Sequence, residues 1–337
     1  MSTEPTQRLT LVAGAGGFIG GHLVRELIER GVNVRAVDCK PLEQWFQVHD
    51  GGENCVLDLS LREAGEEAVA GIADVYNLAA DMGGMGFIEG NKALCMLSVL
   101  INTQLLIAAQ DASVERFFYA SSACVYPAAK QSSPDVAPLR EEDAYPADPE
   151  DGYGWEKLFS ERMCRHYMED FGLETRVARY HNVYGPNGSW TGGREKAPAA
   201  ICRKVAEAVQ SGSEEIGVWG DGKQTRSFMY VDDCVRGTIE VLEGPRIDPI
   251  NLGSAELVTV DQLVDAVEGI AGAKLRSNYR TDAPQGVRGR NSDNTRFRET
   301  YGWEPSISLR EGLAKTYEWV SAQVAAELAG ANPSARA

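Results

Sequence analysis

The chain has 337 residues, of which 43% are hydrophobic and 24% charged, a composition typical of a globular protein with a large core. Its net charge of −16 leaves no basic stripe that could neutralise phosphates, so we expect no nucleic-acid partner. We expect no membrane-spanning stretch and, because residues 1–8 lack a signal-peptide core, a cytoplasmic location. The seven scattered cysteines and four histidines show no ligand spacing, so neither a disulfide framework nor a metal site is predicted.

The first predicted elements are a strand, a glycine turn and a helix. Residues 9–13 are a short apolar run, the glycine turn follows at once, and residues 18–30 repeat apolar side chains at helical spacing. Gly14 permits a tight turn, Gly17 lets the backbone approach a pyrophosphate at the helix N-terminus, and Gly20 lets the helix pack closely on the strand. The predicted cofactor-binding residues of this loop are Gly14, Gly16, Gly17, Phe18, Ile19 and Gly20.

A second apolar run, residues 32–37, ends in Asp38. A carboxylate at this place can hold both hydroxyls of an adenosine ribose and would repel a 2′-phosphate, which favours NAD over NADP as the cofactor. Asp58 is predicted to contact the adenine, with a turn at the end of a strand as the alternative. A glycine loop alone is often only a tight connection, so the dinucleotide interpretation depends on Asp38 and on the catalytic residues downstream.

Later apolar runs continue the alternation of strands and helices. Residues 74–79, 116–120 and 175–178 predict strands, and residues 226–233 and 249–252 predict returns to the same sheet. The alternation predicts an α/β protein with a doubly wound parallel sheet, a Rossmann fold.

A smaller, mixed α/β lobe is predicted to bind the substrate, with helices over residues 195–211 and 260–271. Because its segments interleave with the sheet, the lobe is not one contiguous block. The expected domains are an NAD-binding domain over 1–182 with returns near 226–254, a substrate lobe over 183–225 and 255–322, and a tail over 323–337.

Tyr153 and Lys157 are four residues apart, which places them on one face of a predicted helix. A lysine cation there is expected to lower the pKa of the tyrosine, so that the phenolate takes a hydroxyl proton while hydride leaves the carbon for NAD. Ser122, at the end of a predicted strand, can hydrogen-bond the same substrate oxygen. An exposed Tyr and Lys on a helix are common, so the pattern gains its weight from following the glycine loop. It predicts oxidation of a substrate hydroxyl.

Several segments of the chain carry a resemblance to a known family. They are AADMGGMGF at 79–87, SSACVYP at 121–127, GGREKAP at 192–198, WGDG at 219–222 with QTRSF at 224–228, and GVRGRNSD at 286–293. On these residues, the chain resembles the GDP-mannose 3,5-epimerase family of extended short-chain dehydrogenase/reductases, over about residues 8–320. The motif NVYGP at 182–186 is shared by many extended members and is less specific.

The resemblance implies a double inversion of the sugar of GDP-mannose. Oxidation at C4 by NAD makes the hydrogens on C3 and C5 acidic, and re-reduction by NADH leaves the cofactor unconsumed. By similarity, Cys124 is the base and Lys196 the acid on the opposite face, giving GDP-L-galactose, GDP-L-gulose or both. A thiol suits the base role where nearby cations stabilise its thiolate.

Two other reactions of the superfamily stay open as alternatives. A sugar-nucleotide dehydratase would have a Glu in place of Cys124, and a simple 4-epimerase would not need Cys124 and Lys196 together.

The resemblance also implies substrate contacts between the two lobes. Four cations are assigned to the pyrophosphate and the sugar: Lys204, Arg226, Arg288 and Arg290. Arg290 best matches the substrate arginine of the family, and Gly84 is expected to let the backbone approach the sugar. A homodimer is expected through helices near residues 94–109 and 155–168. The predicted substrate-binding residues are Gly84, Ser122, Asn182, Glu195, Lys196, Lys204, Gln224, Arg226, Arg288 and Arg290.

Overall fold

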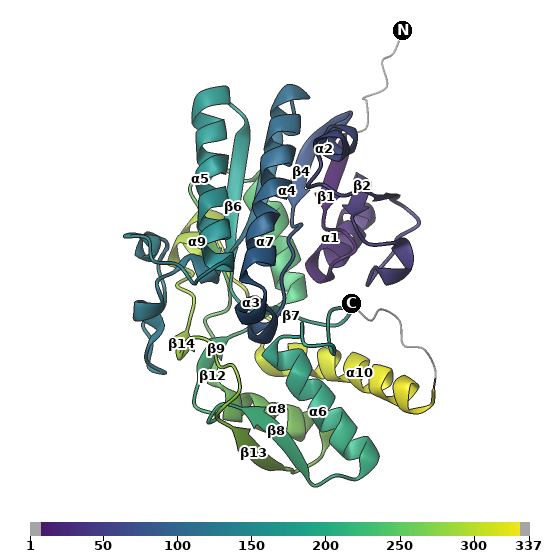
Figure 1. Cartoon of the computed structure of the whole chain (residues 1–337), viewed down its shortest axis with the longest axis vertical. Helices are drawn as coiled ribbons and strands as arrows, with labels where there is room; N and C mark the ends of the chain where they lie inside the picture. Colours follow the sequence, from purple (N-terminus) through teal and green to yellow (C-terminus); the bar gives the residue numbers. More distant parts are fainter. Residues whose placement is uncertain (1–7, 331–337) are drawn as a thin grey trace.

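The structure, a computed structural model, describes residues 8–330 in two parts (Figure 1). The larger part is a seven-stranded sheet with helices on both faces, and the smaller part is a helical lobe drawn in the lower half of the view. The strands of the large sheet are β1 (Leu9–Ala13), β2 (Asn33–Asp38), β3 (Glu53–Val56), β4 (Ile72–Asn77), β5 (Arg116–Ser122), β6 (Glu174–Tyr180) and β11 (Ile250–Leu252).

Every pairing in this sheet is parallel, and the strand order is β11-β6-β5-β4-β1-β2-β3. The direction of winding reverses between β1 and β4. The carboxyl ends of these two strands therefore border the crevice in which doubly wound sheets bind their ligands. The predicted doubly wound parallel sheet is confirmed; β3 was missed because it is a short, partly exposed edge strand.

Alternating side chains assign the helices to the two faces of the sheet. Leu11 and Ala13 belong to one hydrophobic cluster, with residues of three helices that pack side by side, whereas Val12 between them belongs to a second cluster on the other face. Both faces are buried, as expected of a parallel sheet. The helices of the first face are α2 (Arg62–Val69), α4 (Lys92–Asp111) and α5 (Tyr153–Phe171), and those of the second are α1 (Phe18–Glu29) and α7 (Val231–Glu243).

The smaller lobe is built around three mutually packed helices, α6 (Ala197–Ser211), α8 (Val260–Ala271) and α10 (Leu309–Leu328). Thr259 and Gln262 form a reciprocal capping box at the start of α8, which gives that helix the boundaries predicted from the sequence. Its other elements are β8 (Glu215–Trp219) with β13 (Arg276–Arg280), and the three-stranded sheet of β12 (Leu257–Thr259), β9 (Thr225–Ser227) and β14 (Gly289–Arg290).

The remaining elements are short. They are α3 (Met85–Gly90), α9 (Thr295–Tyr301), β7 (Val183–Tyr184) paired with β10 (Met229–Tyr230), and the 3₁₀ turns η1 (Leu42–Gln44), η2 (Ala123–Val125), η3 (Ala128–Gln131) and η4 (Glu141–Ala144).

Three boundaries differ from the prediction. Residues 226–233 do not rejoin the large sheet, because two short strands there pair elsewhere and α7 begins at Val231, with Asp232 and Asp233 in its first turn. Helix α6 begins at Ala197, two residues late, with Pro198 in its first turn. Helix α10 continues to Leu328, so the first residues of the predicted tail are helical, and residues 331–337 lie outside the described part.

Helix α4 corrects the expectation that no apolar stretch could span a membrane. Its 20 residues are long and apolar enough by length and composition, within residues 8–330. It packs on α2, α3 and α5, and its buried side chains, Leu105 and Leu106 among them, join the core of the sheet. One face of α4 is therefore packed in the core, while other apolar side chains of the helix, Leu97 among them, are exposed.

Candidate active site

The glycine loop between β1 and α1 has the shape that a dinucleotide pyrophosphate requires. Gly14 has a φ of +81°, and a Cβ there would come within 2.9 Å of the Ala79 backbone. A Cβ on Gly20 would lie 2.1 Å from the Gly14 oxygen, so only glycine lets α1 pack so closely. Gly17 precedes α1 without a side-chain cap, which leaves the first N–H groups of the helix available to an anion.

Two carboxylates follow neighbouring strands: Asp38 ends β2, and Asp58 lies just after β3. Asp38 is buried and accepts the Lys40 N–H at 3.1 Å. Asp58 accepts both the N–H and the hydroxyl of Ser60, at 3.0 and 2.7 Å, which is the strand-end turn given as the alternative to an adenine contact. The adenine contact of Asp58 therefore stays a prediction.

Trp45 is a residue of this region that sequence analysis missed. A Cβ on Gly16 would lie 2.6 Å from the Trp45 ring, whose Nε1 donates to the Lys40 carbonyl oxygen at 2.8 Å. The indole thus explains why position 16 is glycine. Nothing in the local sequence indicates this contact, because it depends on how the segment after β2 folds back over the loop.

Tyr153, the first residue of α5, meets Ser122 from the end of β5. The Ser122 hydroxyl is hydrogen-bonded to the tyrosine and also accepts the Cys124 N–H at 3.2 Å. Gly154 packs directly on this turn, since a Cβ there would lie 2.3 Å from the Cys124 carbonyl oxygen. Serine, thiol and phenol are therefore fixed relative to one another by backbone contacts.

Lys157, predicted to lower the pKa of Tyr153, has its Nζ 5.4 Å from the centre of the Tyr153 ring. Its Nζ donates to the Tyr119 hydroxyl at 3.0 Å and lies 3.5 Å from the Glu156 carboxylate. Burial raises the pKa of Tyr153 well above its ordinary value, and the hydrogen bond from Ser122 offsets only part of this. The sequence pattern placed the lysine on the correct face but did not reveal Tyr119 and Glu156 as its partners.

One cavity of about 230 Å³ brings most of the predicted residues together. Cys124 and Lys196 both line it, although 71 positions separate them in the chain. The other predicted residues on its wall are Gly84, Ser122, Tyr153, Asn182, Glu195, Lys204, Gln224, Arg226 and Arg290.

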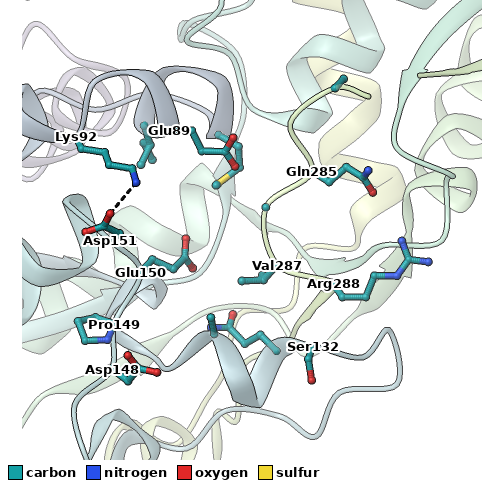
Figure 2. A pocket seen from close by; sticks show the side chains of 16 residues that line it. Glu89, Lys92, Ser132, Asp148, Pro149, Glu150, Asp151, Gln285, Val287 and Arg288 are labelled. Atoms are coloured by element: carbon teal, nitrogen blue, oxygen red, sulfur yellow. Dashed lines mark hydrogen bonds and ion pairs between the residues drawn. The ribbon is translucent and has the colours of Figure 1, made fainter. Parts of the chain in front are cut away.

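Arg288 is not on this wall. Its guanidinium makes two hydrogen bonds to the Asp221 carboxylate, at 2.8 and 2.7 Å. It lines instead a neighbouring, more open cavity of about 510 Å³ (Figure 2), which shares Met85, Ile88 and Gln285 with the first. The substrate role of Arg288 therefore stays a prediction.

The backbone at Gly84 contacts another segment of the protein. Its N–H donates to the Arg194 carbonyl oxygen at 2.8 Å, and a Cβ on Gly84 would lie 2.4 Å from the Glu195 carbonyl oxygen. Glycine is needed here for the approach of the segment that carries Lys196, which is a different reason from the predicted approach to a sugar.

The cavity holds three buried or half-buried cations near its thiol. Burial lowers the pKa of Arg226 to about 10, and its guanidinium donates to the Thr225 carbonyl oxygen at 2.7 Å. Burial likewise lowers the pKa of Lys204, which donates to the Gly217 oxygen at 2.7 Å, and that of Lys196. These cations provide positive charge for an anionic ligand inside a strongly acidic protein.

Arg290 is a cation in contact with the thiol. Its Nη1 lies 3.8 Å from the Cys124 Sγ, its Nε donates to the Gln131 Oε1 at 2.6 Å, and Glu150 pairs with its other amino group. Sequence analysis missed Gln131 and Glu150. No local pattern marks them, since they act on a residue more than 130 positions away.

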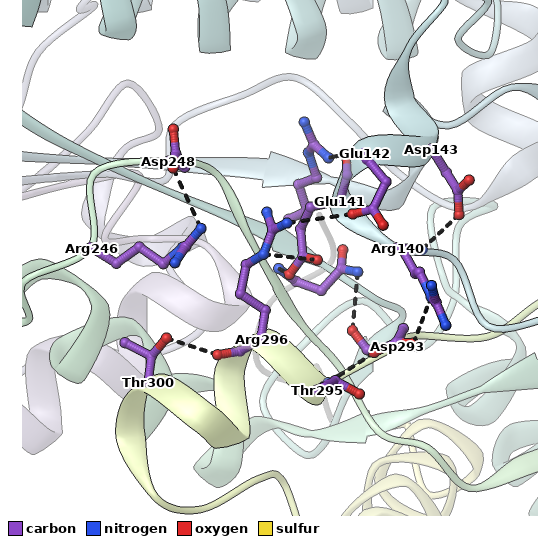
Figure 3. A network of polar contacts seen from close by, with 12 residues as sticks. Arg140, Glu141, Glu142, Asp143, Arg246, Asp248, Asp293, Thr295, Arg296 and Thr300 are labelled. Atoms are coloured by element: carbon purple, nitrogen blue, oxygen red, sulfur yellow. Dashed lines mark hydrogen bonds and ion pairs between the residues drawn. The ribbon is translucent and has the colours of Figure 1, made fainter.

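A network of ion pairs supports the strand that carries Arg290 (Figure 3). Arg296 in α9 lies 3.6 Å from Glu141 and 3.4 Å from Glu142, and Arg140 lies 3.4 Å from Asp293. The network joins η4 to the chain immediately after β14. The network thereby holds together the chain that follows Gln131 and the chain that follows Arg290.

Within residues 8–330, no group of three or more His, Cys, Asp or Glu side chains is placed to hold a metal ion. The described site is thus organised by glycines, cations and one thiol.

Comparison with known proteins shows the family to which the chain belongs. The model of the NAD dependent epimerase/dehydratase family matches residues 10–253. GDP-mannose 3,5-epimerase 1 of Oryza sativa subsp. japonica is 44% identical over 325 residues, which cover 96% of this chain and 84% of that protein. The Arabidopsis thaliana GDP-mannose 3,5-epimerase is 43% identical over 327 residues, covering 96% of this chain and 85% of that protein.

A solved structure shares the fold. The crystal structure of UDP-glucose 4-epimerase with UDP-glucose from Thermotoga maritima has a TM-score of 0.84 at 27% identity, covering 92% of this chain and 98% of that one. The predicted resemblance to the GDP-mannose 3,5-epimerases is confirmed by the relatives above. The chain belongs to the NAD dependent epimerase/dehydratase family.

Proposed function

We propose that this protein epimerises GDP-mannose at C3 and C5, giving GDP-L-galactose, GDP-L-gulose or both. The observation that carries the proposal is that Cys124 and Lys196 line the same cavity as Ser122 and Tyr153. Two proton-transfer groups beside an oxidation site are what a double inversion requires and what a simple 4-epimerisation does not use. The relatives that are GDP-mannose 3,5-epimerases support the choice of substrate.

NAD, for which the glycine loop and Asp38 fit, supplies the hydride acceptor at C4. Tyr153 takes the proton of the C4 hydroxyl, and Ser122 holds both the tyrosine and the substrate oxygen. Burial raises the pKa of Tyr153, so its phenolate needs a positive charge close to the ring. Lys157 contacts the rings of Tyr119 and Tyr153 and supplies the positive charge beneath them.

The inversions use the two groups that face the sugar. With a ketone at C4, the Cys124 thiolate removes the proton from C3 or C5, and the Arg290 guanidinium lies 3.8 Å from its Sγ. Lys196 returns a proton to the carbon. Its lowered pKa makes its ammonium a stronger acid than that of an ordinary lysine, which suits protonation of an enolate.

The remaining cavity cations fit a nucleoside diphosphate. Arg226 and Arg290 offer planar guanidinium groups, which bind phosphate oxygens in pairs, and Lys204 adds a point charge. We assign the pyrophosphate and the sugar to these groups, with Asn182 and Gln224 as polar contacts on the same wall.

The deciding experiment is incubation of the purified protein with GDP-mannose in heavy water, followed by NMR of the sugar. Deuterium at both C3 and C5 without added NAD is the expected result, and deuterium at C5 alone would identify GDP-L-gulose as the main product. Absence of deuterium at both carbons would refute the proposal and would favour a 4-epimerase or dehydratase acting on another nucleotide sugar.

A cytoplasmic location remains our prediction.

We also propose that two copies of the chain associate through α4 and α5. These helices pack side by side and expose large apolar side chains, among them Leu97 and Phe159, each 56% exposed, with Leu94, Leu100 and Trp155 close in sequence. Such a contiguous apolar face is typical of an association surface.

Sedimentation velocity tests the dimer. We expect the wild type to sediment at twice the chain mass and the double variant Leu97→Lys, Phe159→Lys at the chain mass. Leu328→Lys, at a side chain that is 66% exposed outside this face, is the matched control. A monomeric wild type would exclude the association.

A further inference from the structure

Two glycine-containing segments that line the cavity are held together by one arginine. The first segment, residues 81–87, leads into α3, and the second, residues 192–196, ends at the N-cap of α6. Arg194 in the second segment donates to the Asp81 carboxylate at 2.7 Å and to the Met82 carbonyl oxygen at 3.2 Å. Its guanidinium also lies 3.7 Å from the centre of the Phe87 ring.

The backbone of both segments is shaped for this contact. The Gly84 N–H donates to the Arg194 carbonyl oxygen, and a Cβ on Gly83 would lie 3.2 Å from the Arg194 Cα. Gly192 and Gly193 have φ values of +83° and +85°, a conformation that favours glycine. The two segments therefore meet at a single set of contacts centred on Arg194.

The contacts of Arg194 are anchored on both sides. The Asp81 N–H donates to the Ser98 hydroxyl of α4 at 3.0 Å, which ties the first segment to the large sheet. Glu195, the next residue in the second segment, accepts from Arg203 of α6 at 3.2 Å. Arg194 thus connects the NAD-binding domain to the first turn of α6.

Lys196 follows two residues after Arg194. It is the N-cap of α6, where its carbonyl oxygen accepts the Ala200 N–H at 3.0 Å, so its backbone position is set by the start of the helix and by the segment before it. Its ammonium is half-buried on the cavity wall that also contains Cys124. A shift of the second segment would therefore move the ammonium relative to the thiol.

We propose that Arg194 is a positioning residue, which fastens residues 81–87 to residues 192–196 and thereby fixes the Lys196 ammonium in the cavity that it shares with Cys124. The inference rests on the proposed function for its catalytic consequence, because Lys196 is there the group that returns the proton. It assigns Arg194 no contact with substrate or cofactor.

The first test separates proton removal from proton return. In heavy water, removal of a proton by Cys124 followed by return on the same face places deuterium in unreacted GDP-mannose, whereas return by Lys196 gives the epimer. For Arg194→Met, we expect epimer formation to fall by at least about tenfold relative to this exchange, because a displacement of about 1 Å can cost about 10²-fold. Arg194→Lys keeps the positive charge but not the planar guanidinium, and it should restore part of the ratio of epimer formation to exchange.

A matched control exists in α7. Arg236 pairs with Glu240 at 3.0 Å and lies 3.8 Å from the Trp303 ring centre, so Arg236→Met removes the same two kinds of contact away from the cavity. It should leave the ratio of exchange to inversion unchanged. If Arg194→Met folds poorly, Asp81→Asn takes its place as the test variant. It weakens the same contact between the two segments with a smaller change, and it should move the ratio in the direction expected for Arg194→Met.

A second test does not depend on the substrate. The titration of Lys196 can be followed by NMR of ¹³C-methylated lysines, with Lys196→Arg to assign its signal. Release of the segment should expose the ammonium, so its pKa should rise toward the ordinary value in Arg194→Met and not in Arg236→Met.

The outcomes distinguish the two proposals. An unchanged Lys196 titration in Arg194→Met, or an equal loss of exchange and inversion, would overturn the positioning role. A wild-type protein that places no deuterium at C3 or C5, in either GDP-mannose or a product, would refute the proposed function, while a shifted Lys196 titration in Arg194→Met would still support the positioning role of Arg194.

Discussion

The two halves of the site are built in opposite ways. The cofactor half is formed by one short stretch, in which Gly14, Gly17 and Gly20 shape a single turn and helix start. The proton-transfer half gathers Cys124, Lys196 and Arg290 from three distant segments. The first half is encoded locally, and the second exists only after the two lobes have packed.

This difference determines how each half should fail. Damage to the glycine loop should weaken cofactor binding and the fold together, because the loop is also where α1 packs on the sheet. Damage to the proton-transfer half should leave both intact and change only the fate of the oxidised sugar.

The largest effect is expected for Cys124→Ala. Loss of the base should lower the rate of inversion by about 10²–10⁴-fold, while oxidation at C4 through Tyr153 continues. Deuterium uptake measures the inversion, and absorbance at 340 nm of the bound nicotinamide measures the oxidation at C4. Equal loss of both signals would mean that the two halves are not separable.

Gly20→Ala tests the cofactor half. The added Cβ would lie 2.1 Å from the Gly14 oxygen, so we expect destabilisation of about 1–3 kcal/mol and loss of retained NAD. Thermal unfolding and the NAD content of the purified protein measure these effects. Gly269→Ala is the control, because its Cβ would meet nothing closer than 3.8 Å within helix α8; it should stabilise by about 1 kcal/mol.

Gln131→Leu tests the long-range support of Arg290. The buried Gln131 amide accepts from Arg290 and donates to the Tyr126 and Pro127 carbonyl oxygens, so its loss leaves buried groups unpaired at about 1–3 kcal/mol. We expect KM for GDP-mannose to rise about tenfold with the NAD content unchanged. The exposed neighbour Ser132→Ala should change neither, and an unchanged KM in Gln131→Leu would exclude the support.

The smallest effect concerns pH. Lys196 acts in its protonated form, so activity is present below its pKa and is lost as pH rises through it. Because burial lowers that pKa, the alkaline loss of kcat should occur below the 10.5 of an ordinary lysine. In Lys196→Arg, the alkaline limb should disappear at a lower overall rate; its persistence would assign it to another group.

The sequence predicted what depends on local periodicity and spacing. Apolar runs located six of the seven strands of the large sheet, and the spacing of Tyr153 and Lys157 placed both on α5. The resemblance placed Cys124 and Lys196 in one cavity. β3 escaped because its edge position leaves a weak apolar pattern.

What the sequence could not predict depends on contacts between distant segments. Arg288 shares a basic motif with Arg290, yet only the fold pairs it with Asp221. Tyr119, which accepts from Lys157, and Gln131, which accepts from Arg290, likewise come from other elements, and the burial that raises the pKa of Tyr153 depends on what packs around it. Spacing reports which residues share a face, and it does not report what packs over that face.

The contact between Gly154 and the Cys124 carbonyl has a consequence for how such a site changes over generations. The contact is made by backbone and by a missing side chain, so the residue type at position 124 does not enter it. A mutation there can replace a thiol by a carboxyl while the tyrosine helix stays in register. The placement of Tyr153 can therefore be inherited unchanged while the side chain at position 124 varies.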